Sequence, residues 1–201
     1  MRKMFYSVVK FILKPIFFLI YRPIVIGGEN IPKSSSLVLA GNHTSWKDPL
    51  LLISVVKRRV HFLAKIELFK GPLAPFIKGM GCIPVNRKIH DKGALNSAKE
   101  VLKEGEVIGI FPEGTINRTS DFIMPFKIGA VKMTADMDSV IVPFVITGSY
   151  GIFKNRVKIE FLESRKIAKD LDEENAKLMK SISDKLEEDY ERNKFIKTKD
   201  D

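Results

Sequence analysis

The sequence LVLAGNHTSWKDPLLLISVV (residues 37–56) contains the transition on which the predicted fold depends. Its first part, Leu37 to Ala40, is a short apolar run typical of a buried strand. Its last part, Pro49 to Val56, is apolar and follows Asp48. The Asp-Pro pair favours a helix start, with Asp as N-cap and Pro at the first helical position. A strand followed by a helix, with polar residues between them, is the repeating unit of an α/β fold.

The same alternation continues along the chain. Runs rich in β-branched residues predict strands at Pro23 to Gly27, Leu37 to Ala40, Val60 to Ala64, Cys82 to Val85, Val107 to Phe111, Val140 to Ile146 and Val157 to Leu162. Helical patterns occur at 48–56, 67–78, 91–103, 127–137 and from Asp170 to about Asn193. Because strands and helices take turns, we expect an α/β fold, a single domain with a largely parallel central sheet flanked by helices.

The size and charge suit one domain with an anionic partner. The chain has 201 residues, of which 45% are hydrophobic and 29% charged, enough to fill one core. The net charge of +10 favours nucleic acid, a phospholipid surface or an acidic carrier protein, and charge alone does not choose among them. Cys82 is the single cysteine, which excludes an intramolecular disulfide and any multi-cysteine zinc site.

Residues 1–22 predict an amphipathic helix in front of the domain, which then covers 23–201. The polar residues Lys3, Ser7, Lys10 and Lys14 recur every three or four positions and therefore form one helical stripe. The opposite face carries Phe5, Val8, Val9, Phe11, Ile12, Ile16, Leu19 and Ile20.

The lysines decide how this helix is expected to meet a membrane. Each lysine near the centre of a span costs about 2.5–3.5 kcal/mol, so Lys10 and Lys14 disfavour a crossing. We expect a helix that lies in the headgroup region. Amphipathicity alone leaves a second interpretation open, a helix packed on the protein's own core.

Asn42 to Asp48 places polar side chains at the end of a predicted strand, where active sites of α/β sheets form. A carboxylate at Asp48 can face back toward His43 across the turn. Such a carboxylate fixes the imidazole tautomer and stabilises the imidazolium, so the pair can act as a general base. A protein nucleophile is unnecessary if the substrate supplies its own hydroxyl. The alternative is that Asp48 only caps the helix and His43 is a turn residue.

Two further strand ends carry weaker signals. Phe111 to Thr115 brings Glu113 and a hydroxyl to a turn, although a Pro-Glu-Gly turn by itself more often indicates structure than function. Gly81 to Arg87 is an apolar strand that ends on an arginine. Arginine is the usual bidentate partner of phosphate, but a single one is more often a solvated surface residue.

Taken together, these segments resemble the phospholipid/glycerol acyltransferase family, in particular its bacterial 1-acyl-sn-glycerol-3-phosphate acyltransferases. The turn from His43 to Asp48 is similar to the family's His-x4-Asp motif, and the other matching blocks are Gly81 to Arg87, Phe111 to Thr115, Val140 to Ile146, Ala64 to Phe69 and Phe126 to Ala130. The resemblance covers about residues 24–163, and several ordered motifs are far more specific than one.

The resemblance implies a role for each matching residue. His43 would be the general base and Asp48 its orienting partner. Arg87 would hold the acceptor phosphate, with Lys65 and Lys127 as weaker candidates for the same task. Glu113, Gly114 and Thr115 would shape the acceptor site.

The resemblance also implies the substrates and the location. A fatty acyl group would pass from acyl-CoA or acyl-carrier protein to lysophosphatidic acid at the cytoplasmic face of the membrane, with a peripheral or monotopic attachment. It implies no metal and no cofactor beyond the acyl donor. Many relatives carry Arg directly after the Thr of the third block, whereas Ile116 stands here and Arg118 follows two positions later.

The remaining candidates are expected to be structural. Cys82 lies in an apolar strand and is expected to be buried rather than nucleophilic. His61 and His90 have no acidic neighbour at metal-ligand spacing, and Trp46 is expected to pack against the core.

Three other functions are weighed against the acyltransferase. A nucleic-acid binder is disfavoured because the sequence lacks a recognition-helix signature, a zinc module and interleaved aromatic and basic residues. A non-catalytic membrane-binding scaffold would tolerate the loss of His43. An acyltransferase for glycerol 3-phosphate or another lysolipid stays open.

Overall fold

The strand that precedes His43 lies in the middle of the sheet. The computed structural model describes residues 2–86, 89, 91–151 and 156–197. Its seven-stranded sheet has the order β1-β7-β6-β2-β5-β3-β4. The strands are β1 (Ile24–Ile26), β2 (Leu37–Gly41), β3 (Val60–Lys65), β4 (Ile83–Val85), β5 (Val107–Ile110), β6 (Val140–Tyr150) and β7 (Arg156–Phe161).

Most neighbouring strands are parallel. Leu37 of β2 is in register with Val107 of β5 on one side and with Val140 of β6 on the other. β6 and β7 form the antiparallel pair of the sheet. This arrangement confirms the predicted α/β fold with a largely parallel central sheet.

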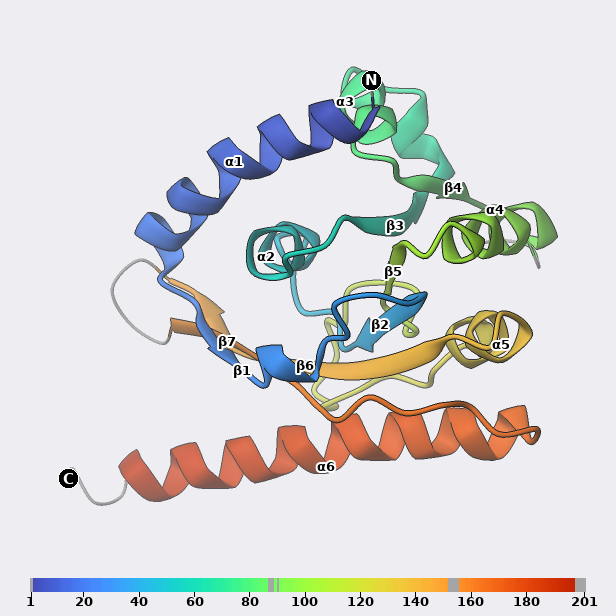
Figure 1. Ribbon diagram of the computed structural model, residues 1–201. Coiled ribbons are helices and arrows are strands. Elements are labelled where there is room, and N and C mark those ends of the chain that lie inside the picture. The colour runs from blue at the N-terminus through green and yellow to red at the C-terminus, as the bar shows by residue number, and fades with distance from the viewer. Residues whose placement is uncertain (1, 87–88, 90, 152–155, 198–201) are drawn as a thin grey trace.

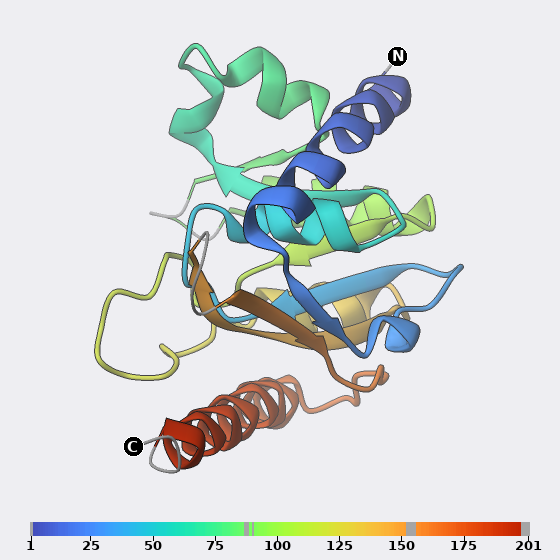
Figure 2. The same cartoon turned by 90° about the vertical axis from the view of Figure 1, so that its left-hand side faces the viewer.

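The helices cover both faces of the sheet. They are α1 (Arg2–Tyr21), η1 (Gly28–Asn30), α2 (Asp48–Val55), η2 (Ile66–Phe69), α3 (Ala74–Gly79), α4 (Lys92–Lys103), α5 (Gly129–Asp136) and α6 (Leu171–Lys197). α2 lies between α1 and the sheet, whereas α4, α5 and α6 lie on the other face (Figure 1). The view in Figure 2 shows α1 and α6 on opposite sides of the molecule.

The alternation of side chains along β2 explains why this strand is apolar throughout. Leu37 and Leu39 enter the core under α1 and α2, whereas Val38 and Ala40 enter the core under α4, α5 and α6. A strand buried on both faces carries apolar residues at every position.

Two predicted element boundaries are wrong. The single helix expected at 67–78 is divided into η2 and α3, because Gly71-Pro72 interrupts it and proline has no N–H for an intrahelical hydrogen bond. The strand expected to end at Ile146 continues to Tyr150, because antiparallel pairing with β7 extends it past Thr147.

α1 presents most of its apolar side chains outward. Within its lysine stripe, Lys10 turns toward the protein, whereas Lys14 is exposed. The Lys10 ammonium donates hydrogen bonds to the carbonyls of Val56, Lys57 and Arg58, just beyond the end of α2, where the helix dipole favours a cation. Exposed apolar residues on α1 are Met4, Phe5, Val8, Phe11, Ile12, Ile16, Leu19 and Ile20.

The helix packs on the domain along one side, as the second interpretation expects, and leaves an apolar face exposed on the other side. Tyr6 and Phe17 are buried against the domain, while Phe11 is 82% exposed on the opposite side. By length and composition, Lys3–Tyr21 could also cross a membrane.

Candidate active site

The structure brings His43 and Asp48 into contact at the carboxyl end of β2. The Nδ1 atom of His43 lies 2.8 Å from Oδ2 of Asp48. Asp48 is fully buried and His43 is 8% exposed. A carboxylate at Nδ1 fixes the tautomer in which Nδ1 carries the proton, so Nε2 is the nitrogen that can accept one.

Asp48 is held by four further hydrogen-bond donations. Oδ2 accepts from the backbone N–H groups of Thr44 (2.7 Å) and Ser45 (2.8 Å), and Oδ1 accepts from the hydroxyls of Thr44 (3.3 Å) and Tyr150 (2.6 Å). These donors offset the cost of burying a charge.

The predicted helix cap is wrong in detail. Lys47 occupies the N-cap position of α2, and Asp48 is already helical. The Asp48 carboxylate does not cap the helix because it accepts from the preceding turn and from the imidazole instead. The interpretation of Asp48 as a simple capping residue is therefore excluded by its contacts.

Asn42 fixes the point at which His43 leaves the sheet. Its side-chain amide donates to the carbonyl of Ile146 (2.9 Å) and accepts from the N–H of the same residue (2.8 Å). This amide replaces a backbone pair between β2 and β6, so the chain can turn away without leaving buried polar groups of β6 unpaired.

Three groups from the loop after β5 hold His43 in place. The N–H of His43 donates to Oε1 of Glu113 (2.7 Å), and its carbonyl accepts from the N–H of Asn117 (2.8 Å). The ring of Phe111 stacks on the imidazole with a centroid separation of 4.0 Å. The imidazole is thus supported on its Nδ1 edge and on one face.

Glu113 links the histidine to the following loop. Its second carboxylate oxygen accepts from the N–H of Met124 (3.0 Å). Burial, which outweighs the two hydrogen bonds, raises the pKa of the Glu113 carboxyl above its usual value. Glu113 therefore positions His43 through the backbone, a function that the sequence did not indicate.

A pocket of about 320 Å³ opens beside His43. It lies between the carboxyl end of the sheet, the loop around Asn117 and α6. Its lining residues are Asn42, His43, Thr44, Glu113, Asn117, Thr119, Asp121, Phe122, Ile146, Thr147, Gly148, Leu186, Asp189 and Tyr190. The wall is mostly uncharged, with amides and hydroxyls beside apolar side chains.

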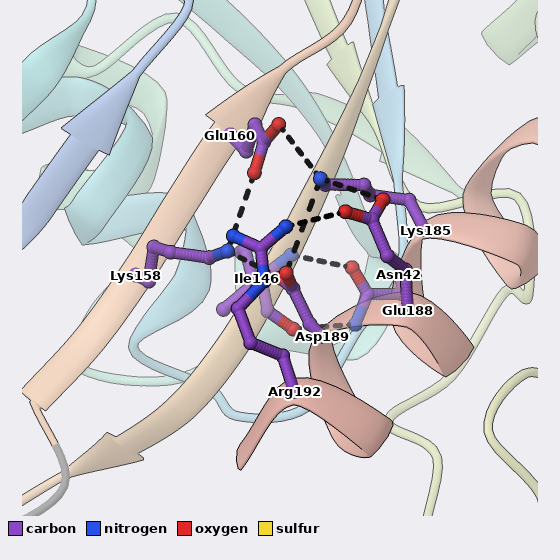
Figure 3. Close-up of polar contacts among 8 residues, drawn as sticks. All are labelled: Asn42, Ile146, Lys158, Glu160, Lys185, Glu188, Asp189 and Arg192. Atoms are coloured by element: carbon purple, nitrogen blue, oxygen red, sulfur yellow. Dashed lines mark hydrogen bonds and ion pairs between the residues drawn. The ribbon is translucent and has the colours of Figure 1, made fainter. Parts of the chain in front are cut away.

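An ion-pair network fixes α6 at this pocket. Lys158 of β7 pairs with Asp189 and with Glu160 (3.2 Å), and Lys185 of α6 pairs with the same Glu160 (3.2 Å). Figure 3 shows these side chains beside the pair formed by Asn42 and Ile146. The network explains how a helix far along the chain comes to line the pocket.

The predicted substrate-binding residues lie in different places. Of these, Glu113 lines the pocket, whereas Gly114, Thr115, Lys65 and Lys127 are not among its lining residues. Lys127 covers Gly114, where any Cβ would lie 2.9 Å from the lysine ammonium. Lys65 is exposed at the end of β3, 3.6 Å from Glu67. Arg87 lies outside the described residues.

The other singled-out residues behave differently from one another. Nδ1 of His61 contacts the carbonyl of Gly81 (2.8 Å), and burial lowers the pKa of the His61 imidazole, so its role is structural. Burial raises the pKa of the Cys82 thiol to about 11. His90 lies outside the described residues. In residues 2–86, 89, 91–151 and 156–197, no group of three or more His, Cys, Asp and Glu side chains is placed to bind a metal.

Trp46 does not pack in the core as expected. It is 67% exposed, because the turn before α2 directs it outward. The Lys47 ammonium lies 5.9 Å from the Trp46 ring and 4.9 Å from the ring of Tyr21, the last residue of α1.

The sequence did not predict the side chains that reach the site from elements far away along the chain. Tyr150, Leu186 and Asp189 reach the site from β6 and α6, and no local pattern marks them. Asn42 could have been identified, because a buried amide at the end of an apolar strand needs partners for both its donor and its acceptor.

The fold and site define a class of protein: an α/β protein in which a buried carboxylate holds a histidine at the edge of the sheet, beside an open pocket. Residues 22–147 match the model of the Acyltransferase family. Since this match covers more than half of the chain, the protein belongs to the Acyltransferase family.

Individual relatives point the same way. The chain is 38% identical to the 1-acyl-sn-glycerol-3-phosphate acyltransferase of Borreliella burgdorferi over 65% of this chain and 53% of that protein. It is 35% identical to the enzyme of that name from Bacillus subtilis over 62% of each chain. The matched regions thus span about half to three fifths of these relatives.

The comparison extends to a crystal structure. The 1-acyl-sn-glycerophosphate (LPA) acyltransferase PlsC of Thermotoga maritima superposes with a TM-score of 0.76 at 25% identity. The superposition covers 93% of this chain and 80% of that one. The superposition therefore extends beyond the segment that the family model matches.

Proposed function

We propose that the protein transfers a fatty acyl group from a thioester to the sn-2 hydroxyl of 1-acyl-sn-glycerol 3-phosphate, giving phosphatidic acid. The observation that carries the proposal is the contact of 2.8 Å between His43 and the buried Asp48, next to an open pocket. The family membership and the names of the relatives favour this acceptor.

The chemistry needs one base. Nε2 of His43 takes the proton of the acceptor hydroxyl while the oxygen attacks the thioester carbonyl. The carbon–sulfur bond then breaks, and the imidazolium returns the proton to the leaving thiolate. The products are an ester and a free thiol, and Asp48 stabilises the imidazolium between the two steps.

The net charge of the protein and the family resemblance support an anionic acyl donor, either acyl-CoA or acyl-carrier protein. Acyl-CoA and acyl-carrier protein are both anionic, and the protein has a net charge of +10. The donor is distinguished by measuring kcat/KM with each thioester at low and high salt. A carrier protein that docks through charges loses more of its rate at high salt than CoA does.

The outward apolar face of α1 supports a membrane-bound reaction. Residues 1–22 would lie on the cytoplasmic face of the membrane, with the domain of residues 23–201 beside the lipid. Trp46, exposed near the end of α1, suits the same interface, because aromatic side chains with a polar edge favour the headgroup region.

A pair of matched variants tests the proposed base. His43 and His61 are each 8% exposed, and Nδ1 of each lies 2.8 Å from an oxygen. The change His43→Gln should abolish acyl transfer to lysophosphatidic acid, while His61→Gln should keep it. If both variants are equally active, His43 is not the base. If the wild type acylates only another lysolipid, lysophosphatidic acid is not the acceptor.

A further inference from the structure

Tyr150 joins the buried carboxylate of the site to the N-terminal helix. It is the last residue of β6, and its hydroxyl donates to Oδ1 of Asp48 at 2.6 Å. This is the shortest hydrogen bond that Asp48 accepts. Burial, followed by the charge of Asp48, raises the pKa of the Tyr150 phenol, so the hydroxyl remains a donor at any physiological pH.

The ring of Tyr150 packs on α1. It meets the ring of Phe17 edge to face at 6.1 Å and the ring of Tyr21 at 5.6 Å. The ammonium of Lys47 lies 5.4 Å from the centre of the Tyr150 ring. Three elements therefore meet at this side chain: β6, the last turn of α1 and the turn that carries Asp48.

We propose that Tyr150 is a positioning residue that sets the orientation and charge of Asp48, and that α1 holds Tyr150 in place for this purpose. The proposal rests on the proposed function only for its kinetic readout. It goes beyond the His43–Asp48 pair, because the packing of α1 on Tyr150 then affects the geometry of Asp48.

The direction of the effect follows from the hydrogen bond. A hydroxyl that donates to Asp48 draws electron density from the carboxylate and weakens its attraction for the imidazolium. Loss of this hydroxyl leaves a more basic but less well-oriented carboxylate. The other titratable or charged groups that face the carboxylate and the phenol are Lys47, Tyr21 and Glu113, and the test leaves them in place.

The test is Tyr150→Phe, which keeps the ring contacts and removes the hydroxyl. Tyr6→Phe is the matched control, because the Tyr6 hydroxyl also forms one buried hydrogen bond under α1, accepting from the N–H of Val60 at 3.1 Å. The 201-residue chain is followed by NMR, where its three histidines give resolvable ring resonances, and by acyl-transfer kinetics with lysophosphatidic acid.

In Tyr150→Phe we expect the His43 ring titration to move to higher pH, and kcat to fall about tenfold or more while KM changes less than about twofold. Phe17→Ala removes one of the rings that pack on Tyr150 and keeps the Tyr150 hydroxyl. This variant should shift the titration in the same direction by a smaller amount. Tyr6→Phe should shift neither the titration nor kcat.

Three results would overturn the proposal. The first is a His43 titration in Tyr150→Phe that coincides with the wild type. The second is an equal loss of kcat in Tyr150→Phe and Tyr6→Phe, which would indicate a general loss of stability. The third is a Phe17→Ala titration unchanged from the wild type, which would refute the part played by α1. If the wild type does not acylate lysophosphatidic acid, the proposed function fails, and the NMR titrations still decide the role of Tyr150.

Discussion

The change Asp48→Asn should separate the electrostatic role of Asp48 from its structural role. Oδ2 accepts from three N–H donors, one on each of His43, Thr44 and Ser45, whereas Oδ1 accepts from two hydroxyls. An amide can place its oxygen at the Oδ2 position and its NH2 toward the hydroxyls, which can rotate to accept. All five of these groups then keep a partner, and the site loses only its negative charge.

The size of the effect can be worked out from the geometry. With Nδ1 and Oδ2 2.8 Å apart, the charge centres of imidazolium and carboxylate lie about 4 Å apart, and their attraction is about 4 kcal/mol at an effective dielectric constant of about 20. Because each 1.36 kcal/mol is about tenfold in rate, kcat should fall about a thousandfold. The free energy of unfolding should fall by only about 1–2 kcal/mol.

Asp48→Ala is the contrasting variant. It leaves the part-buried N–H groups of Thr44 and Ser45 without their acceptor, at a cost of up to about 3 kcal/mol each. Urea unfolding and acyl-transfer assays are run on the wild type and both variants. The reasoning is refuted if Asp48→Asn keeps more than about a tenth of wild-type kcat, or if Asp48→Ala is as stable as Asp48→Asn.

Three further predictions concern other parts of the molecule. Cys82→Ala should keep wild-type kcat within about twofold, and the native thiol should react slowly with iodoacetamide at pH 8, since its pKa is about 11; rapid labelling with loss of activity would contradict this. Burial raises the pKa of the Glu113 carboxyl in the native state, so the native state holds this proton more tightly than the unfolded state does. The stability gained from this proton is lost as the pH rises through the raised pKa. Urea unfolding from pH 4 to 7 should therefore show the wild type losing stability relative to Glu113→Gln, and parallel curves would rule this out. Phe11→Ser with Leu19→Ser should weaken binding to anionic vesicles at least about a hundredfold, since each apolar side chain contributes about 1.5–3 kcal/mol on leaving water; unchanged sedimentation with vesicles would exclude α1 as the anchor.

The fold could be predicted from local patterns because each strand and most helices carry their own signal. The run from Leu37 to Ala40 indicates a buried strand without any knowledge of its partners. The helix predicted at 67–78 is wrong because apolar spacing alone does not show that Gly71-Pro72 divides it into η2 and α3. The predicted end of β6 at Ile146 is too early because Thr147 to Ser149 is polar, and only the pairing with β7 shows that the strand continues.

The site could be predicted where its residues are close in the sequence. His43 and Asp48 are five positions apart, so one turn is enough to bring them together. Tyr150 is 102 positions from Asp48, and its contact depends on β6 lying beside β2, which no local pattern specifies. The outward position of Trp46 could not be predicted, because burial of a single turn residue depends on the elements packed around it.

The central position of β2 has a consequence for synthesis of the protein on the ribosome. When the chain has emerged only as far as α4, β2 has neither of its neighbours, which pair with it through Val107 and Val140. His43 then lacks Glu113, and Asp48 lacks Tyr150. Because these pairings join residues far apart in the sequence, a nascent chain of this length cannot yet hold the His43–Asp48 pair in its final surroundings, and the apolar strand β2 lacks both neighbours until β6 has been made.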